Sequence, residues 1–310
     1  MPQLHKHLNV SGNAMTTPKQ YEKIRVISAT VEGDRFAVAE WEKNIQVWDL
    51  ENGLIAKFPT DIVSGMTNAV SISGDGKQIA VAGYDNKTVT LYNTDKGEII
   101  WQRKDIKKPA TTIILNNYPD LIYIDTENQG AFFLDKKNGK TIEKLRSIEF
   151  IRENPYSNVD QFEKASTSVL INRKDRKTIK SFNHKSFAML DACFSKDKII
   201  CSYSGNPIEA ISLNKIETLW TTRVVGHFLE VEYSNELDKI LGIRWEYENG
   251  GPKYLSYIEI ETGQVEKEIN LGEPIEIKFL KQGGLMLTSQ GKLYSTLTGQ
   301  LTKQFDFESE

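Results

Sequence analysis

The sequence VSISGDGKQIAVAGYDNKTVTLYNTDKGE (70–98) alternates short apolar segments with polar turns. Apolar or β-branched residues dominate 69–73, 78–82 and 88–92, and the turn between the first two segments is Gly74-Asp75-Gly76. Short runs of this kind, bounded by glycine and small polar residues, are typical of β-strands. A further turn, Lys96-Gly97, leads into another apolar segment that ends at Gln102. The stretch therefore predicts four consecutive strands joined by tight turns.

The last two strands and their turn recur along the chain at a nearly regular spacing. The turn glycines run from Gly53 to Gly299, which is 246 residues over six intervals, or 41 residues per repeat. A period of about 40–45 residues with four strands per repeat is the signature of β-propeller blades. The seven copies are NIQVWDLENGLIAKF (44–58), TVTLYNTDKGEIIWQ (88–102), GAFFLDKKNGKTIEKL (130–145), TSVLINRKDRKTIKSF (167–182), PIEAISLNKIETLW (207–220), YLSYIEIETGQVEKEI (254–269) and KLYSTLTGQLTKQF (292–305).

The repeat predicts an all-β fold, a seven-bladed β-propeller with four antiparallel strands per blade. Blade 4 is the hardest to place, because residues 152–163 are polar and irregular. Residues 21–310 are expected to form one domain, and residues 1–20 a flexible N-terminal leader. A blade cannot bury both faces of its own sheet, so stacking in a ring supplies the core. Ring closure is expected either from blade 1 packing directly on blade 7 or from residues 15–23.

Composition excludes several classes of function. The 39 basic and 42 acidic residues give a net charge of −3, which offers no bulk attraction to nucleic acid or to an anionic membrane. The first 20 residues lack the apolar core of a secretory signal, and no stretch is apolar enough to span a bilayer. Cys193 and Cys201 both lie in apolar runs and are interpreted as buried thiols of a reducing compartment, although paired strands would allow a disulfide. These features predict a cytoplasmic protein that is monomeric by itself.

Residues 70–98 and the run Glu42-Lys43-Asn44-Ile45-Gln46-Val47-Trp48-Asp49 resemble WD-repeats, and Gly226-His227 resembles the Gly-His that opens such a repeat. The family stabilises each blade by a network of His, Ser or Thr, a turn Asp and the Trp. Here the turn position holds Glu42 in blade 1 and Asn86 in blade 2, and Trp48 has only Tyr92 as its counterpart. The resemblance implies a propeller that serves as a binding platform.

A second resemblance is to quinoprotein-type propeller blades. It rests on LYNTDKGEIIWQ (91–102) and ISLNKIETLW (211–220), which place Trp101 and Trp220 on an outer strand. That family repeats the Trp in most blades, whereas this chain has it in two. We therefore interpret both side chains as structural packing and not as part of a quinone site.

The sequence carries no pattern of catalytic, metal-binding or cofactor-binding residues. The four histidines have no second His or Cys at the spacing of metal ligands, and no nucleophile elbow or phosphate-binding loop occurs. We expect a protein that is not an enzyme and that binds no cofactor. The alternative is a propeller enzyme of lactonase, lyase or quinoprotein type with its site at the central channel.

Three loops predicted on one face of the ring combine aromatic and acidic residues. Exposed aromatic side chains are common anchors of protein interfaces, and carboxylates favour a partner with basic groups. The alternative is that Trp41 and Trp245 pack at strand ends between blades. The basic run 173–177, on the opposite face, is interpreted as a solvated turn, with phosphate contact as the alternative. We expect a protein-interaction module (adaptor, scaffold or inhibitory capping protein) whose partner-binding residues are Trp41, Glu42, Tyr84, Asp85, Trp245, Glu246 and Tyr247.

Overall fold

The computed structural model describes most of the chain between residues 24 and 307. The described ranges are 24–30, 32–40, 44–58, 67–83, 87–115, 120–126, 130–145, 149–153, 159–164, 167–172, 174–175, 177–183, 189–195, 197–204, 207–246, 252–272 and 276–307.

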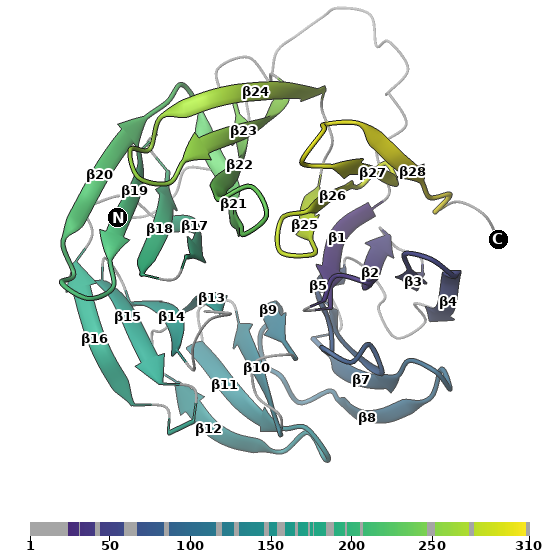
Figure 1. Cartoon of the computed structure of the whole chain (residues 1–310). Coiled ribbons are helices and arrows are strands. Elements are labelled where there is room, and N and C mark those ends of the chain that lie inside the picture. The colour runs from purple at the N-terminus through teal and green to yellow at the C-terminus, as the bar shows by residue number, and fades with distance from the viewer. Residues whose placement is uncertain are drawn as a thin grey trace, which may run out of the picture.

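Within these ranges the chain forms seven four-stranded antiparallel sheets arranged in a ring (Figure 1), which confirms the predicted seven-bladed propeller. Blades 1 to 3 are β1 (Ile24–Ala29), β2 (Arg35–Glu40), β3 (Ile45–Asp49), β4 (Gly53–Phe58); β5 (Thr67–Ile72), β6 (Gln78–Gly83), β7 (Val89–Asn93), β8 (Ile99–Arg103); β9 (Ala110–Ile114), β10 (Leu121–Thr126), β11 (Gly130–Asp135), β12 (Thr141–Leu145). Blades 4 and 5 are β13 (Glu149–Glu153), β14 (Val159–Lys164), β15 (Thr167–Asn172), β16 (Thr178–Asn183); β17 (Met189–Phe194), β18 (Lys198–Tyr203), β19 (Pro207–Ser212), β20 (Thr218–Arg223). Blades 6 and 7 are β21 (His227–Ser234), β22 (Lys239–Trp245), β23 (Lys253–Glu259), β24 (Val265–Gly272); β25 (Ile277–Leu280), β26 (Leu285–Thr288), β27 (Lys292–Ser295), β28 (Leu301–Gln304).

The hydrophobic core is divided among the joints between blades. Seven clusters of buried side chains are present in the described residues, and each combines residues of two neighbouring blades. Middle strands such as β6 and β18 are buried along nearly their whole length, because another blade covers each face of their sheet. Outer strands such as β8 and β20 are half-exposed. Stacking of blades therefore supplies the core, as the repeat predicts.

Four of the five glycine turns that define the sequence period share one backbone conformation. Gly97, Gly139, Gly263 and Gly299 have φ between +68° and +74°, and each N–H donates to the carbonyl oxygen four residues earlier. In blade 5 the same position is held by Ile216, with φ of 57°. Glycine adopts this left-handed conformation without steric cost, which explains why it recurs at this position.

Beyond these turns, the outer strands run along the perimeter of the ring toward the next blade (Figure 1). A register shift interrupts the pairing of the third and fourth strands in every blade, next to equivalent residues such as Trp101, Lys180, Trp220 and Lys303. These four side chains donate to the carbonyl oxygen of the first residue after the third strand of the next blade. We call this contact the cross-blade bond.

The acceptors of the cross-blade bond are equivalent in position but not in residue type. Trp101 Nε1 donates to the oxygen of Lys136 at 2.9 Å, and Trp220 Nε1 to that of Ile260 at 2.9 Å. Lys180 Nζ donates to the oxygen of Leu213 at 2.9 Å. Lys303 Nζ donates to the oxygen of Leu50, which joins blade 7 to blade 1. The bond therefore recurs at four of the seven joints in the described part of the chain.

In the described residues, blade 7 packs directly on blade 1, the first of the two predicted modes, and each of these sheets consists of four consecutive strands. Phe305 and Phe307, which follow the last strand, pack edge-on against Phe36 and Trp48 of blade 1 with ring centroids 5.1–6.3 Å apart. The Phe307 carbonyl oxygen accepts a hydrogen bond from Gln46 Nε2 at 2.9 Å. Residues 15–23, the predicted alternative, and the predicted leader 1–20 lie outside the described residues.

Cys193 and Cys201 are free and buried, which confirms the predicted thiols. They lie on the paired strands β17 and β18 but contribute to clusters on opposite faces of the sheet. Their side chains therefore point apart. In the part of the chain that the structure describes, no helix is long and apolar enough to cross a membrane.

Candidate partner-binding surface

The structure describes two of the seven residues predicted to bind a partner. Trp245 is the last residue of β22 and is half-buried, and Glu246 follows it with a side chain that is 39% exposed. Trp41, Glu42, Tyr84, Asp85 and Tyr247 lie outside the described residues. Their convergence on one face remains a prediction, and the site can be built only around blade 6.

Blade 6 has the longest described strands of the ring. Its strands have seven or eight residues, whereas those of the other blades have four to six. The pairing of β22 continues to its end, where Trp245 lies between His227 of β21 and Lys253 of β23. The ladder therefore fixes the backbone of Trp245 on both sides.

A buried arginine anchors this end of the blade. Arg244, with a side chain that is 7% exposed, forms two parallel hydrogen bonds with Glu268, Nε to Oε1 at 2.7 Å and Nη2 to Oε2 at 2.9 Å. Its Nη1 donates to Glu246 Oε1 at 2.8 Å and to the Val225 carbonyl oxygen at 2.7 Å. The guanidinium also lies over the Tyr254 ring, 4.5 Å from its centroid. Arg244 thus joins β23, β24, the Glu246 carboxylate and the connection from blade 5.

Both partners of the buried pair stay charged. Burial disfavours the carboxylate of Glu268, but hydrogen bonds from Arg244 and Ser256 outweigh it and keep the pKa of Glu268 below its ordinary value. Burial also disfavours the charge of Arg244, but its bonds to Glu268 and Glu246 raise the pKa of the guanidinium. The anchor therefore does not titrate near neutral pH.

The connection between blades 5 and 6 packs tightly on the same place. Gly226 has φ of +91°, and a Cβ atom there would lie 2.1 Å from the carbonyl oxygen of Trp245. Glycine is thus required by both conformation and contact. Beside it, the Val225 side chain is 69% exposed. We call Val225, Trp245 and Glu246 the blade 6 surface: an apolar and aromatic patch next to a carboxylate.

Sequence reasoning missed Val225 and Arg244. A signal for Arg244 was present, because it is the one charged residue inside the run Ile240–Trp245, and a charge in a buried strand requires a partner. That the partner is Glu268, 24 residues later, follows only from strand pairing. Nothing in the sequence indicates Val225, because the exposure of its side chain depends on the conformation of the short connection between blades 5 and 6.

The tryptophans on which the two family resemblances rest form packing and hydrogen-bond contacts within and between blades. Trp48 Nε1 donates to Gln46 Oε1 at 2.8 Å, and the Trp48 ring belongs to the buried cluster between blades 1 and 7. The family positions Glu42 and Asn86 lie outside the described residues. Trp101 and Trp220 form cross-blade bonds, and their rings lie against Gly139 and Gly263 of the next blade.

Known structures share this arrangement of blades. No family model and no curated protein sequence matches the chain. Among solved structures, the Cps50 (Swd1) β-propeller domain of Myceliophteria thermophila matches with a TM-score of 0.68 and 13% sequence identity, over 93% of this chain and 98% of that one. The fold is a seven-bladed β-propeller.

At this identity the likeness concerns the fold alone. The described residues of the chain contain no group of three or more His, Cys, Asp or Glu side chains placed to hold a metal ion. The expectation that the protein has no catalytic or cofactor site stays a prediction.

Proposed function

We propose that this propeller is a non-catalytic protein-interaction module that binds a partner on the blade 6 surface. The observation that carries the proposal is that the strand ladder fixes the backbone of Trp245 and Arg244 holds the Glu246 carboxylate, while both residues stay partly accessible. A preorganised aromatic residue beside a charge loses little conformational entropy on binding, which is typical of interface anchors. WD-repeat propellers commonly serve as interaction scaffolds, which supports the same conclusion.

The chemistry of the blade 6 surface favours a partner with basic and apolar groups. The Glu246 carboxylate accepts from Arg244 at one oxygen, and within the described residues its other oxygen accepts no hydrogen bond, so a donor from a partner could bind there. Val225 and Trp245 supply the apolar contact. Adaptor, scaffold and capping roles all use such a surface, and the identity of the partner decides among them.

The test is affinity purification from the native host, followed by measurement of the dissociation constant for the protein recovered. Trp245→Ala is expected to weaken that binding by about tenfold or more, the loss typical of a central aromatic anchor. Glu246→Gln is expected to weaken it less and to reduce its dependence on salt. The matched control is Leu297→Ala, because Leu297 is 52% exposed on the β27–β28 turn, at the opposite end of the strands.

Thermal unfolding of each variant confirms that the fold is intact. Equal affinities for the wild type, Trp245→Ala and Glu246→Gln would contradict the proposed surface. A loss of affinity in Leu297→Ala alone would place the interface on the other face of the ring.

A further inference from the structure

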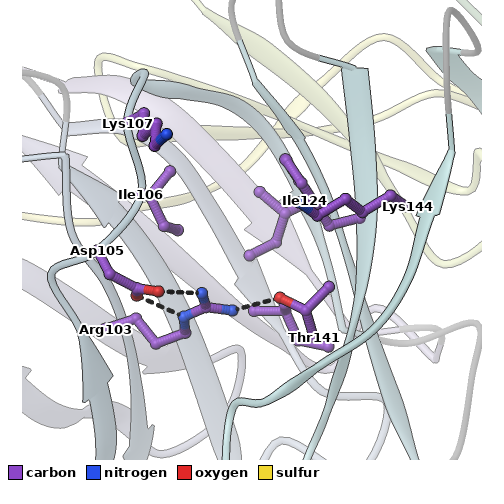
Figure 2. A pocket seen from close by; sticks show the side chains of 9 residues that line it. Arg103, Asp105, Ile106, Lys107, Ile124, Thr141 and Lys144 are labelled. Carbon is purple, nitrogen blue, oxygen red and sulfur yellow. Dashed lines mark hydrogen bonds and ion pairs between the residues drawn. The ribbon is translucent and has the colours of Figure 1, made fainter.

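A pocket of about 490 Å³ lies at the perimeter, where blade 2 meets blade 3. Figure 2 shows the connection from β8 to β9 on one side of it and blade 3 on the other. The volume is in the range of sites that bind small ligands or several side chains. The lining residues are Arg103, Asp105, Ile106, Lys107, Ile124, Phe132, Leu134, Thr141 and Lys144.

The floor of the pocket is apolar. Ile124 and Leu134 are fully buried, and Ile106 and Phe132 are half-buried members of the cluster between blades 2 and 3. These side chains belong to the core, so the floor is held in place by packing on both blades. An apolar side chain that entered the pocket would extend this core.

One wall of the pocket is formed by Arg103 and its ion-pair and hydrogen-bond partners. Arg103 Nε donates to Asp105 Oδ1 at 2.8 Å, and its Nη1 donates to Thr141 Oγ1 at 2.8 Å (Figure 2). The same Nη1 donates to the Gly139 carbonyl oxygen at 3.1 Å. The hydrogen bonds from Arg103 hold the pKa of Asp105 below its ordinary value. Arg103 therefore joins the β8–β9 connection to blade 3. Most of the N–H groups of its guanidinium already donate hydrogen bonds.

The opening carries positive charge. Lys107 and Lys144 line the pocket and are exposed, and in the described residues neither forms an ion pair; the ammonium of Lys144 lies 5.7 Å from the centroid of the Phe132 ring. Lys104, Lys108 and Lys140 flank them in the sequence and are exposed as well. Segments 103–108 and 140–144 together hold six basic and two acidic residues, a net charge of +4, in a chain of net charge −3. The rest of the chain therefore carries −7.

The pocket also lies beside an available strand edge. β12 is the outermost strand of blade 3 and pairs with β11 alone in the described part of the chain. An extended peptide can pair with such an edge through its backbone, while alternate side chains enter pockets beside it.

We propose that this pocket docks an acidic peptide segment of a partner protein that inserts a large apolar side chain between blades 2 and 3. Lys107 and Lys144 face the acidic residues of the segment, and Ile106, Ile124 and Phe132 receive the apolar side chain. The proposal goes beyond the blade 6 surface, because it concerns a different joint and a partner of opposite charge. An apolar floor inside a basic opening favours such a segment over a nucleic acid, which needs stacking surfaces along its bases.

Fluorescence anisotropy on the full chain provides the test. The probes are fluorescein-labelled heptapeptides in which leucine or phenylalanine stands between glutamates, with matched peptides that carry serine for the apolar residues or lysine for the glutamates. Saturable binding with a dissociation constant below about 1 mM is expected only for the peptides that carry both glutamates and an apolar residue. The double variant Lys107→Glu and Lys144→Glu is expected to weaken it by about tenfold, since it replaces attraction by repulsion.

Lys96→Glu is the matched control, because Lys96 is an exposed lysine on the β7–β8 turn, outside the lining. It is expected to bind as the wild type does. Both lysines of the double variant are exposed, so its fold is expected to survive, and thermal unfolding checks this. The proposal is wrong if no acidic peptide saturates, if the serine peptides bind equally well, or if the double variant retains full affinity. Tighter binding of a labelled oligouridine that the same variant abolishes would overturn it in favour of nucleic acid.

Discussion

At the scale of single residues, two turn glycines distinguish the energetic cost of placing a side chain in the left-handed conformation from the cost of a steric clash. A Cβ atom at Gly97 would meet nothing within 4 Å, whereas one at Gly139 would lie 2.8 Å from the Trp101 ring. Both have nearly the same φ. Ile216 shows that a side chain is tolerated at this turn position, at the energetic cost of a left-handed conformation.

We therefore predict that Gly97→Ala lowers the free energy of unfolding by about 1–2 kcal/mol, the cost of the left-handed region for an L-residue. Gly139→Ala is expected to lower it further, because the ring of Trp101 must move. Urea denaturation followed by circular dichroism measures both. An equal loss of unfolding free energy in the two variants would contradict this and show that the Trp101 ring moves without energetic cost.

Glu276 makes stability depend on pH. Burial, followed by repulsion from Glu230, raises the pKa of Glu276 to about 7. In the unfolded chain it titrates near its ordinary value, so between pH 4.5 and 7 the native state holds a proton that the unfolded state has lost. The stability that protonated Glu276 contributes to the folded state is thus fully present below about pH 4.5, and it is lost as the pH rises through about 7.

The corresponding prediction is that the wild type loses free energy of unfolding between pH 5 and pH 8 relative to Glu276→Gln, which cannot ionise. Urea denaturation at several pH values compares the two. Parallel curves would mean that Glu276 is as well solvated in the folded protein as in the unfolded chain.

At the scale of elements, the cross-blade bond is a property of position and not of residue type. Tryptophan and lysine alternate as donors, and the acceptor is always a backbone carbonyl oxygen after the third strand. The bulge that precedes the donor turns the outer strand toward the next blade.

Trp101→Phe and Trp220→Phe retain a ring but lose the donor. We expect each to lower the free energy of unfolding by about 1–2 kcal/mol, the value of a hydrogen bond whose acceptor is then left without its partner. The two joints do not touch, so the double variant should show the sum. Leu219→Ala, an exposed neighbour on the same strand, is expected to change stability by less than about 0.5 kcal/mol. A loss in Leu219→Ala equal to that in Trp220→Phe would contradict the role of the bond.

The sequence predicts the blades because hairpin turns leave a local signal, the glycine of positive φ. It does not predict the cross-blade bond, because a backbone acceptor has no sequence signature and the donors share no chemistry. The candidate site divides in the same way. Trp245 and Glu246 could be predicted because they lie where the sequence places the end of the second strand of blade 6. The Arg244–Glu268 pair depends on strand register, and the pocket between blades 2 and 3 depends on the path of the β8–β9 connection.

At the scale of the whole molecule, the seam between blades 7 and 1 depends on the last described residues. Phe305 and Phe307 are both buried there, although they lie outside the sheet. Their removal opens the cluster on the side of blade 1.

We predict that Phe305→Ala and Phe307→Ala each lower the free energy of unfolding by about 3–5 kcal/mol, as for other large-to-small changes in a core. The two rings share contacts with Phe36 and Trp48, so their effects are not expected to add. Gln300→Ala, exposed on the preceding turn, is the control and should behave as the wild type. Losses below about 1 kcal/mol would mean that the seam holds without these rings.

This seam also sets the order of events during synthesis. The hydrogen bond from Gln46 to Phe307 spans 261 positions, so blade 1 leaves the ribosome long before its final neighbour exists. Blades 1 to 6 are complete in sequence by then, and each interior joint can form as its second blade emerges. Until translation reaches residue 307, the nascent chain is an open arc with an unprotected apolar flank on blade 1, which is the surface that a chaperone would have to shield.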